Sequence, residues 1–201
     1  MTSGIVRLGL SDALSEFLDV ASMVPFFDKY PNIHIESLIG NSLREMQSLE
    51  TDIALGYDAP EGDDLVLICR HSVKCGLFAS QKYIDAYGMP KNITDLVENH
   101  RLCDMINHKA YAEGWGGILD KAKHLVYRSN SIYSFRRAVE CGVGIGMCPF
   151  YYGDKKLVRI KNTGIKYDVA IYMVAHKDTK DMPRIRVTCL LYTSDAADDR
   201  I

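Results

Sequence analysis

The stretch IVRLGLSD, residues 5–12, decides how the start of this chain is expected to fold. Its first six residues are mostly apolar and predict a short buried strand. Ser11 and Asp12 follow directly, and both side chains are good caps for the first turn of a helix. Apolar residues then recur at helical spacing over residues 14–24, so we expect a helix there, which Pro25 kinks or ends.

Two further strands are predicted downstream of this helix. Residues 33–39 (IHIESLI) begin with alternating polarity, and residues 52–56 (DIALG) form a short apolar run. Between them, Ser42 and Glu45 fit the capping-box pattern of a second helix. The alternation of strands and helices is typical of an α/β fold with a parallel sheet. In such sheets, small ligands bind at the carboxyl ends of the strands, beside helix N-termini.

The composition is that of a soluble globular chain with one large domain or two small ones. The 201 residues are 47% hydrophobic, and 24 Lys and Arg stand against 26 Asp and Glu, for a net charge of −2. Because these charges are evenly spread, we expect no nucleic-acid-binding surface on this chain itself. No apolar run approaches the roughly 20 residues of a membrane helix, and no export signal is seen, so a cytoplasmic location is expected.

The cysteines and histidines show no spacing typical of a metal or redox site. The six cysteines form no C-x-x-C pair, so we expect reduced thiols that pack as small hydrophobes, with a redox-sensing pair as the alternative. The six histidines have no metal-ligand spacing, and His100 is expected to be structural. Hydrolase, zinc-protease and nucleotide-loop motifs are absent from the sequence. We therefore expect no enzyme activity, no metal and no cofactor.

Two glycine-rich segments invite a functional interpretation. GVGIG at residues 142–146 does not complete a dinucleotide-binding loop, because Met147 stands where the last glycine is needed. It predicts instead the exit of a helix, where glycine permits left-handed backbone. GWGG at residues 114–117 predicts a turn or mobile loop, in which Trp115 either covers a ligand or anchors packing.

The end of the chain, residues 190–201 (LLYTSDAADDRI), has no amphipathic period and looks like the translation of a vector or adapter scar. We expect a non-native tail and exclude it from the fold. Its three Asp and one Arg account for the net charge of −2, so the rest of the chain is formally neutral.

Four stretches, in this order, resemble the effector-binding domain of LysR-type transcriptional regulators. They are residues 6–9 with 27–31 (VRLG and FDKYP), 52–55 (DIAL), 79–90 with 95–100 (ASQKYIDAYGMP and DLVENH), and 138–149 (AVECGVGIGMCP). The resemblance covers nearly the whole chain up to Thr188. The third stretch is similar to the subgroup typified by the glycine-cleavage activator, although Gln81 stands where that subgroup usually has Pro.

The resemblance implies a two-subdomain α/β clamp of the periplasmic-binding-protein type (type 2), with mixed, mainly parallel sheets. The chain would cross twice between subdomain I, residues 1–74 and 168–189, and subdomain II, residues 75–167, with the ligand in the cleft between them. Intact family members begin with a DNA-contacting winged helix-turn-helix and a dimerising linker helix. This chain starts after both, so DNA binding is expected only through that missing domain. We expect the intact protein to be a homodimer or a homotetramer.

The expected effector contacts in subdomain I follow its three predicted strands. The resemblance places them at Ser11 and at Asn41 and Ser42, and position alone adds Asp12 and Tyr57. The helix start after the first strand favours an anion such as a carboxylate, but Asp12 would repel an acidic ligand. An amino acid or a polar neutral effector therefore fits better. The alternative roles are helix caps for Ser11, Asn41 and Ser42, and a loop aromatic for Tyr57.

In subdomain II, Ser129, Asn130 and Ser131 form the matching turn, which faces the cleft in the family. Three adjacent hydrogen-bonding side chains suit a polar ligand, and the alternative is that they cap the next helix. The predicted function is a regulatory domain of a LysR-type regulator that senses a small polar metabolite. The alternatives are a stand-alone solute-binding protein of a transporter and, third, a small-molecule lyase on the same fold.

Overall fold

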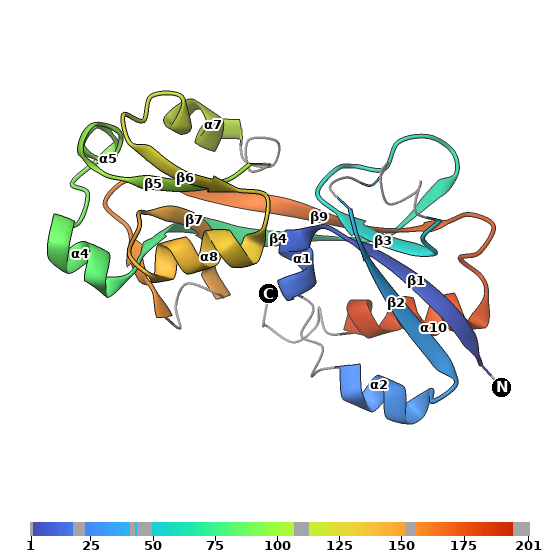
Figure 1. Cartoon of the computed structure of the whole chain (residues 1–201). Coiled ribbons are helices and arrows are strands. Elements are labelled where there is room, and N and C mark those ends of the chain that lie inside the picture. Colours follow the sequence, from blue (N-terminus) through green and yellow to red (C-terminus); the bar gives the residue numbers. More distant parts are fainter. Residues whose placement is uncertain are drawn as a thin grey trace. The chain divides into compact units, whose positions relative to one another are not determined.

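The computed structural model describes residues 2–17, 23–40, 43, 50–106, 113–151 and 156–194, and the chain divides into two compact units. Unit 1 consists of Met1–His71 and Ala170–Ile201, and unit 2 of Ser72–Val169 (Figure 1). Two long strands carry the chain between the units. Strand β4, Leu65–Ala79, leaves unit 1, and strand β9, Lys166–His176, returns to it.

The sheet of unit 1 is built around β1, Gly4–Leu10, which pairs in parallel with both β2 (Ile33–Ile39) and β3 (Ile53–Gly56). This confirms the expected parallel arrangement. Strand β9 adds in antiparallel fashion to β3, so the order is β2-β1-β3-β9. Because the pairing around β1 is parallel, the carboxyl ends of three strands share one edge of the sheet: the last residue of β1 lies opposite Ile39.

Two short helices follow β1 in unit 1, α1 (Asp12–Phe17) and α2 (Val24–Lys29). Residues 18–22 lie outside the described part of the chain, so the expectation that Pro25 kinks or ends the first helix stays a prediction. Pro25 itself stands in the first turn of α2, where its missing N–H removes no helix hydrogen bond and its fixed φ suits the helix. The buried side chain of this helix is Phe26, whose ring packs at 5.1 Å from that of Tyr30.

The last helix, α10 (Pro183–Ser194), lies alongside β1 (Figure 1). Arg184 Nε donates to the carbonyl of Ile5 at 3.1 Å, and Ile185 is fully buried. The helix continues past Thr188 through part of the segment that we expected to be a tail. Residues 195–201 lie outside the described part of the chain.

Unit 2 contains two groups of strands. The short strands β7 (Gly146–Pro149) and β8 (Val158–Ile160) pair with β4 in antiparallel fashion. Strands β5 (Leu102–Met105) and β6 (Leu125–Ser129) pair with each other in parallel. A β-bulge between residues 102 and 103 shifts their register, so Asp104 lies opposite the fourth residue of β6.

Four helices of unit 2 lie entirely within its described residues: α4 (Gln81–Tyr87), α5 (Ile93–Asn99), α7 (Glu113–Leu119) and α8 (Ile132–Glu140). Side-chain caps start the first two. Ser80 Oγ accepts from Tyr83 N–H, and Asn92 Oδ1 accepts from Asp95 N–H. Helices α7 and α8 lie on opposite sides of the β5–β6 pair (Figure 1). Phe135 and Val139 of α8 pack with Cys103 of β5 in the core beneath it.

The prediction of a turn or loop at residues 114–117 is wrong, because these residues form the middle of α7. Glycine is a weak helix former, so tertiary contact must stabilise this helix. That contact is Trp115, whose side chain is fully buried and whose Nε1 donates to Asp104 Oδ1 at 3.0 Å. Of its two predicted roles, Trp115 therefore has the packing role.

The glycines after α8 allow the chain to turn and to approach β5 closely. Gly142 has a φ of +83°, as expected for the exit of a helix. Gly144 lies where a Cβ would stand 2.7 Å from the backbone oxygen of Arg101 and 3.1 Å from Cys103 Sγ. This close approach lets Ile145 N–H donate to the Arg101 carbonyl at 2.8 Å. The close packing of residues 142–146 is thus a property of the core of unit 2.

We expect Gly144→Ala to lower the free energy of unfolding by about 1–3 kcal/mol, because neither the Arg101 backbone nor the packed Cys103 side chain can move away cheaply. Gly117→Ala is the matched control: nothing lies within 4 Å of its Cβ position, and alanine favours the helix by up to about 1 kcal/mol. Urea denaturation of both variants measures the difference. Equal stabilities would contradict the close approach at Gly144.

Candidate functional site

Two residues of the predicted site in unit 1 lie at the same edge of its sheet. Ser11 follows β1 and Tyr57 follows β3, and these neighbouring strands are parallel, with Leu10 opposite Leu55. The Ser11 residue is 6% exposed, whereas Tyr57 is half-buried. The structure therefore brings these two turns together, as expected for the carboxyl ends of parallel strands.

Ser11 is a helix cap in this structure. Its Oγ accepts a hydrogen bond from Leu14 N–H at 3.3 Å, and its carbonyl accepts from Ser15 N–H at 3.0 Å. Asp12 begins α1 and is half-buried, and its carbonyl accepts from Ser15 Oγ at 2.6 Å. The capping role expected of Ser11 is thus present, and one lone pair of its hydroxyl is already engaged.

The second predicted turn of unit 1 falls on Asn41 and Ser42, which lie outside the described residues. Their neighbours are placed. Gly40 N–H donates to the Leu10 carbonyl at 2.9 Å, and the buried Leu43 packs against Ala54 and Val174. The chain therefore leaves β2 at the edge where Ser11 also lies.

In unit 2, Ser129, Asn130 and Ser131 form the turn from β6 into α8. Ser131 is the N-cap residue, but its side chain makes no capping hydrogen bond within the described structure, so the alternative role as a side-chain cap is not seen for Ser131. Ser129 Oγ accepts from Ser131 N–H at 3.0 Å and closes the turn. Asn130 is exposed. The turn therefore presents the amide side chain of Asn130 at the carboxyl end of β6.

A buried ionic cluster lies beside this turn, and our sequence analysis did not identify it. The Asp104 side chain is completely buried, and it accepts hydrogen bonds from Trp115 Nε1 and from Arg128 Nε and Nη2, which both lie 3.2 Å from Oδ2. Arg128 directly precedes Ser129, and its side chain is 41% exposed. The cluster thus runs from the interior of unit 2 to the surface at the end of β6.

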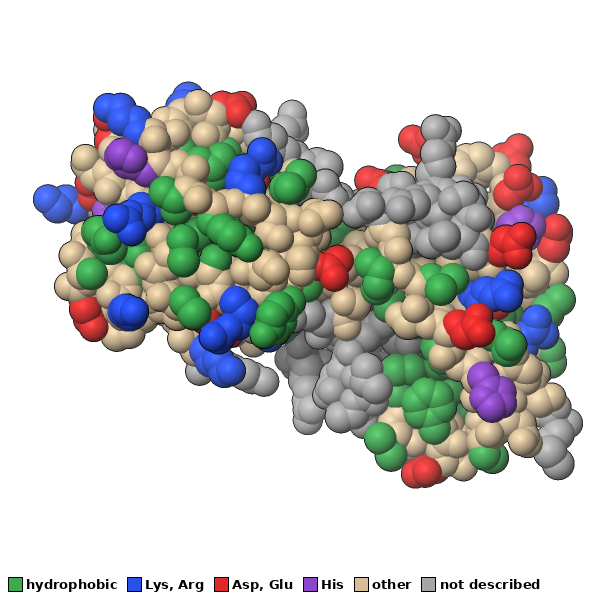
Figure 2. Space-filling model, in the orientation of Figure 1, with side chains coloured by type: hydrophobic (Ala, Val, Ile, Leu, Met, Phe, Trp, Pro, Cys, Tyr) green, Lys and Arg blue, Asp and Glu red, His purple; other side chains and the backbone are tan. Residues whose placement is uncertain are grey.

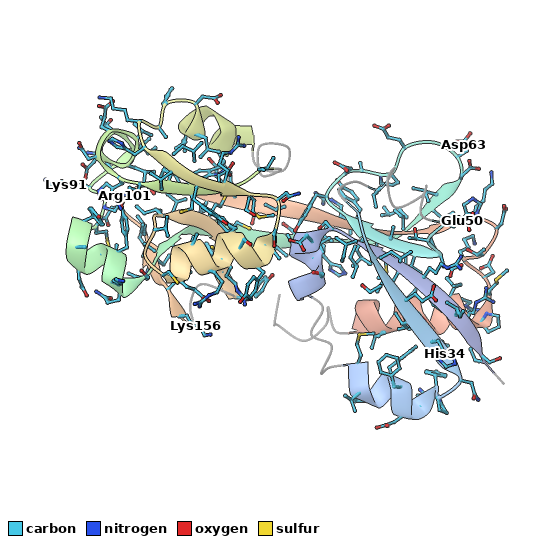
Figure 3. The ribbon with its side chains drawn as sticks, in the orientation of Figure 1. His34, Glu50, Asp63, Lys91, Arg101 and Lys156 are labelled. Carbon is cyan, nitrogen blue, oxygen red and sulfur yellow. The ribbon has the colours of Figure 1, made fainter. Side chains whose placement is uncertain are left out.

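A hollow of about 530 Å³ opens in unit 1 at the other end of β3, where the strand begins. Its lining includes Glu50, Asp52, Asp64 and His176. Several of these groups already have partners: Asp52 Oδ2 accepts from Arg7 N–H at 2.9 Å, and Asp64 pairs with Lys177. Glu50, labelled in Figure 3, pairs with Arg7. This hollow lies away from the predicted contacts Ser11 and Tyr57.

Several basic side chains pack on aromatic rings of the same unit, which leaves them less available to a polyanion. Arg101, labelled in Figure 3, stacks over Tyr87 at 4.7 Å, and Arg159 over Phe150 at 3.5 Å. On the face drawn in Figure 2, Lys and Arg side chains stand in separate groups among hydrophobic and neutral atoms. This distribution agrees with the even spread of charge along the sequence.

Four of the six cysteines are packed in the interior as apolar residues, whereas Cys69 is partly buried and Cys141 is exposed. All six are free, and Cys75, Cys103, Cys148 and Cys189 are buried. Burial raises the pKa of Cys75 and Cys103 to about 12 and that of Cys189 to about 11, and it also raises the pKa of Cys148. Thiols held neutral in this way are poor nucleophiles. In the described residues, no group of three or more His, Cys, Asp or Glu is arranged to hold a metal ion.

His100 is part of a buried hydrogen-bonded cluster rather than a reactive site. Tyr83 Oη accepts from Arg101 N–H at 3.0 Å and lies 3.1 Å from His100 Nδ1. The Tyr83 hydroxyl can therefore donate to Nδ1, which leaves the proton on Nε2, 3.7 Å from Asp95 Oδ2. Burial lowers the pKa of His100, against the opposing effect of the Asp95 carboxylate.

Comparison with known proteins places this architecture in a family. Each of the two α/β units contains parallel strands, and the family model of the LysR substrate binding domain matches residues 1–190. The chain belongs to this family. The mixed α/β fold is accordingly that of periplasmic-binding-protein-like (type 2) domains. A search of curated proteins by sequence found no match.

Solved structures of LysR-type regulators share this fold. The regulatory domain of CrgA from Neisseria meningitidis has a TM-score of 0.77 at 18% identity, over 96% of this chain and 98% of that domain. The regulatory domain of AphB from Vibrio vulnificus has a TM-score of 0.69 at 21% identity, over 96% of this chain and 100% of that domain. Full-length AphB, the Vibrio cholerae virulence activator, has a TM-score of 0.73 at 18% identity, over 96% of this chain and 69% of that protein. These relatives are transcriptional regulators, and the chain matches their regulatory domains.

None of the helices in the described part of the chain has the length and apolar character needed to cross a bilayer.

We expect Ser11→Ala to lower the free energy of unfolding by about 1 kcal/mol in the absence of any ligand, because Leu14 N–H loses its capping partner. Ser3→Ala is the matched control, since Ser3 is exposed and precedes β1. Denaturant unfolding of the purified variants measures both effects. A Ser11→Ala variant as stable as the control would show that the cap contributes nothing.

We expect the stability to fall as the pH drops below about 6.5, because unfolded His100 takes up a proton more readily than the buried, folded residue does. The loss begins at the unfolded pKa and continues down to the lowered folded pKa. The test compares unfolding free energies at pH 7.5 and 5.5 for the unmodified chain and for His100→Asn. If the variant keeps the same pH dependence, His100 is not its source.

Proposed function

We propose that this chain is the effector-sensing domain of a cytoplasmic, oligomeric transcriptional regulator and has no catalytic activity of its own. The observation that carries this proposal is the presence, in each unit, of polar turns at the carboxyl ends of parallel strands: Ser11 and Tyr57 in unit 1, and Ser129 to Ser131 in unit 2. In α/β folds, this edge is where small molecules bind. The family match of residues 1–190 supports the same function.

The proposed effector contacts are the polar side chains of these turns. They are Ser11, Asp12, Asn41, Ser42 and Tyr57 in unit 1, and Ser129, Asn130 and Ser131 in unit 2. Hydroxyl and amide groups of this kind recognise a small polar metabolite by hydrogen bonds. An effector that binds one conformation of the domain more tightly than another shifts the population toward the first, and regulation follows from that difference.

DNA binding belongs to a winged helix-turn-helix domain that would precede this sequence in the intact regulator, according to this proposal. Full-length AphB, of which this chain matches 69%, is a member of the same family. Within the family, we propose the glycine-cleavage-activator-like subgroup, on the segments ASQKYI and YGMP at residues 79–84 and 87–90.

A thermal-shift screen tests the proposal. An effector that binds only the folded state raises the melting temperature by an amount that grows with the logarithm of its concentration above its Kd, so we expect one class of amino acid or small polar metabolite to do so. We expect Asn130→Ala and Ser11→Ala to reduce the ligand-induced shift, each measured against its own ligand-free melting temperature. Ser3→Ala serves as the control. A confirmed effector whose shift is unchanged in both site variants would exclude these contacts.

A further inference from the structure

The guanidinium of Arg128 is held in one orientation by a carboxylate beneath it. Nε and Nη2 both lie 3.2 Å from Asp104 Oδ2, and Asp104 is itself fixed by Trp115 Nε1 on its other oxygen. The Asp104 side chain is completely buried, whereas the Arg128 side chain is 41% exposed. One edge of the guanidinium therefore faces the interior of unit 2, and the remaining part of the side chain reaches solvent.

This arrangement prepares Arg128 to bind an anion. A guanidinium carries five N–H donors in a planar fork, and its Nε–Nη2 edge is occupied by Asp104. The Nη1 end lies outside that edge. Because two hydrogen bonds already restrict the rotation of the side chain, less conformational entropy is lost when a ligand binds. Arg128 is also the last residue before the turn of Ser129 to Ser131, so its charge lies at the end of β6.

The start of α8 adds a second favourable contribution at the same strand end. This helix has nine residues and begins at Ile132, four positions after Arg128. Its N-cap residue, Ser131, makes no side-chain capping bond in the described structure. The positive end of the helix dipole thus lies next to the turn and favours a negatively charged ligand there.

We propose that Arg128, positioned by Asp104, binds a carboxylate group of the effector. This inference rests on the proposed sensing function and narrows its ligand to small carboxylates. Asp104 acts through Arg128 and is a positioning residue.

The test uses matched pairs of probes that differ only in charge. Benzoate, succinate and L-alanine are each compared with their primary amides, benzamide, succinamide and L-alaninamide, by thermal shift and by calorimetric titration of the purified chain. We expect at least one acid to bind and its amide to bind at least tenfold more weakly. We expect Arg128→Gln to weaken binding of that acid at least tenfold and Arg128→Lys to weaken it less.

Arg137→Gln is the control, because Arg137 is exposed on α8 and pairs with Glu140. This variant removes the same charge as Arg128→Gln, but away from the end of β6. We expect its affinity for the acid to stay within twofold of that of the unmodified chain. If Arg128→Gln does not fold, because Asp104 is left buried without its cation, the double variant Asp104→Asn with Arg128→Gln removes both charges and gives the same readout. Circular dichroism and the ligand-free melting temperature establish which variants are folded.

Three outcomes would overturn the inference: amides that bind as tightly as their acids, an acid whose affinity is unchanged by Arg128→Gln, or no binding by any of the three acids. The sensing function is judged separately, by adding neutral sugars and nucleosides to the same screen. Binding of a neutral compound that depends on Ser11 or Asn130 would leave the sensing function standing and remove only the role of Arg128.

Discussion

Parallel pairing of neighbouring strands is the constraint on which the candidate site depends in both units. In unit 1, β1 pairs in parallel with β2 and β3, and in unit 2, β5 pairs in parallel with β6. Parallel strands end at the same edge of a sheet, so the turns that follow them lie together regardless of their separation in sequence. Polar residues of the candidate site lie where that edge meets a helix start, as at Ser11 and Ser131.

Local signals were sufficient to predict the start of unit 1. The first three strands form the predicted parallel sheet, and Ser11 caps the helix that follows the first of them. Helix α7 could not be predicted in this way, because its glycines disfavour a helix and the stabilising contact is between Trp115 and Asp104. A segment of this kind is helical only because its tertiary environment makes it so.

The Asp104–Arg128 pair shows a second limit of prediction from sequence. An acidic residue in the apolar strand LCDM is a visible signal, but its partner depends on register. Counting from the pair Leu102 and Leu125 would place Asp104 opposite Tyr127, whereas the bulge after residue 102 moves it opposite Arg128. Neither strand sequence predicts this bulge, so the pairing of Asp104 with Arg128 can be seen only in the folded structure. Asn41 and Ser42 lie outside the described residues, and their part in the site stays a prediction.

The two crossings of the chain, in β4 and β9, also order the events of biosynthesis. Unit 2 is one continuous segment, Ser72–Val169, inserted into unit 1. Strand β3 receives its partner β9 only after residue 176 has been made, and α10 comes later still. During synthesis on the ribosome, all residues of unit 2 are therefore made before the last strand and helix of unit 1, and the edge of β3 is unpaired until then. Unit 1 is the first of the two to be started and the last to complete its fold.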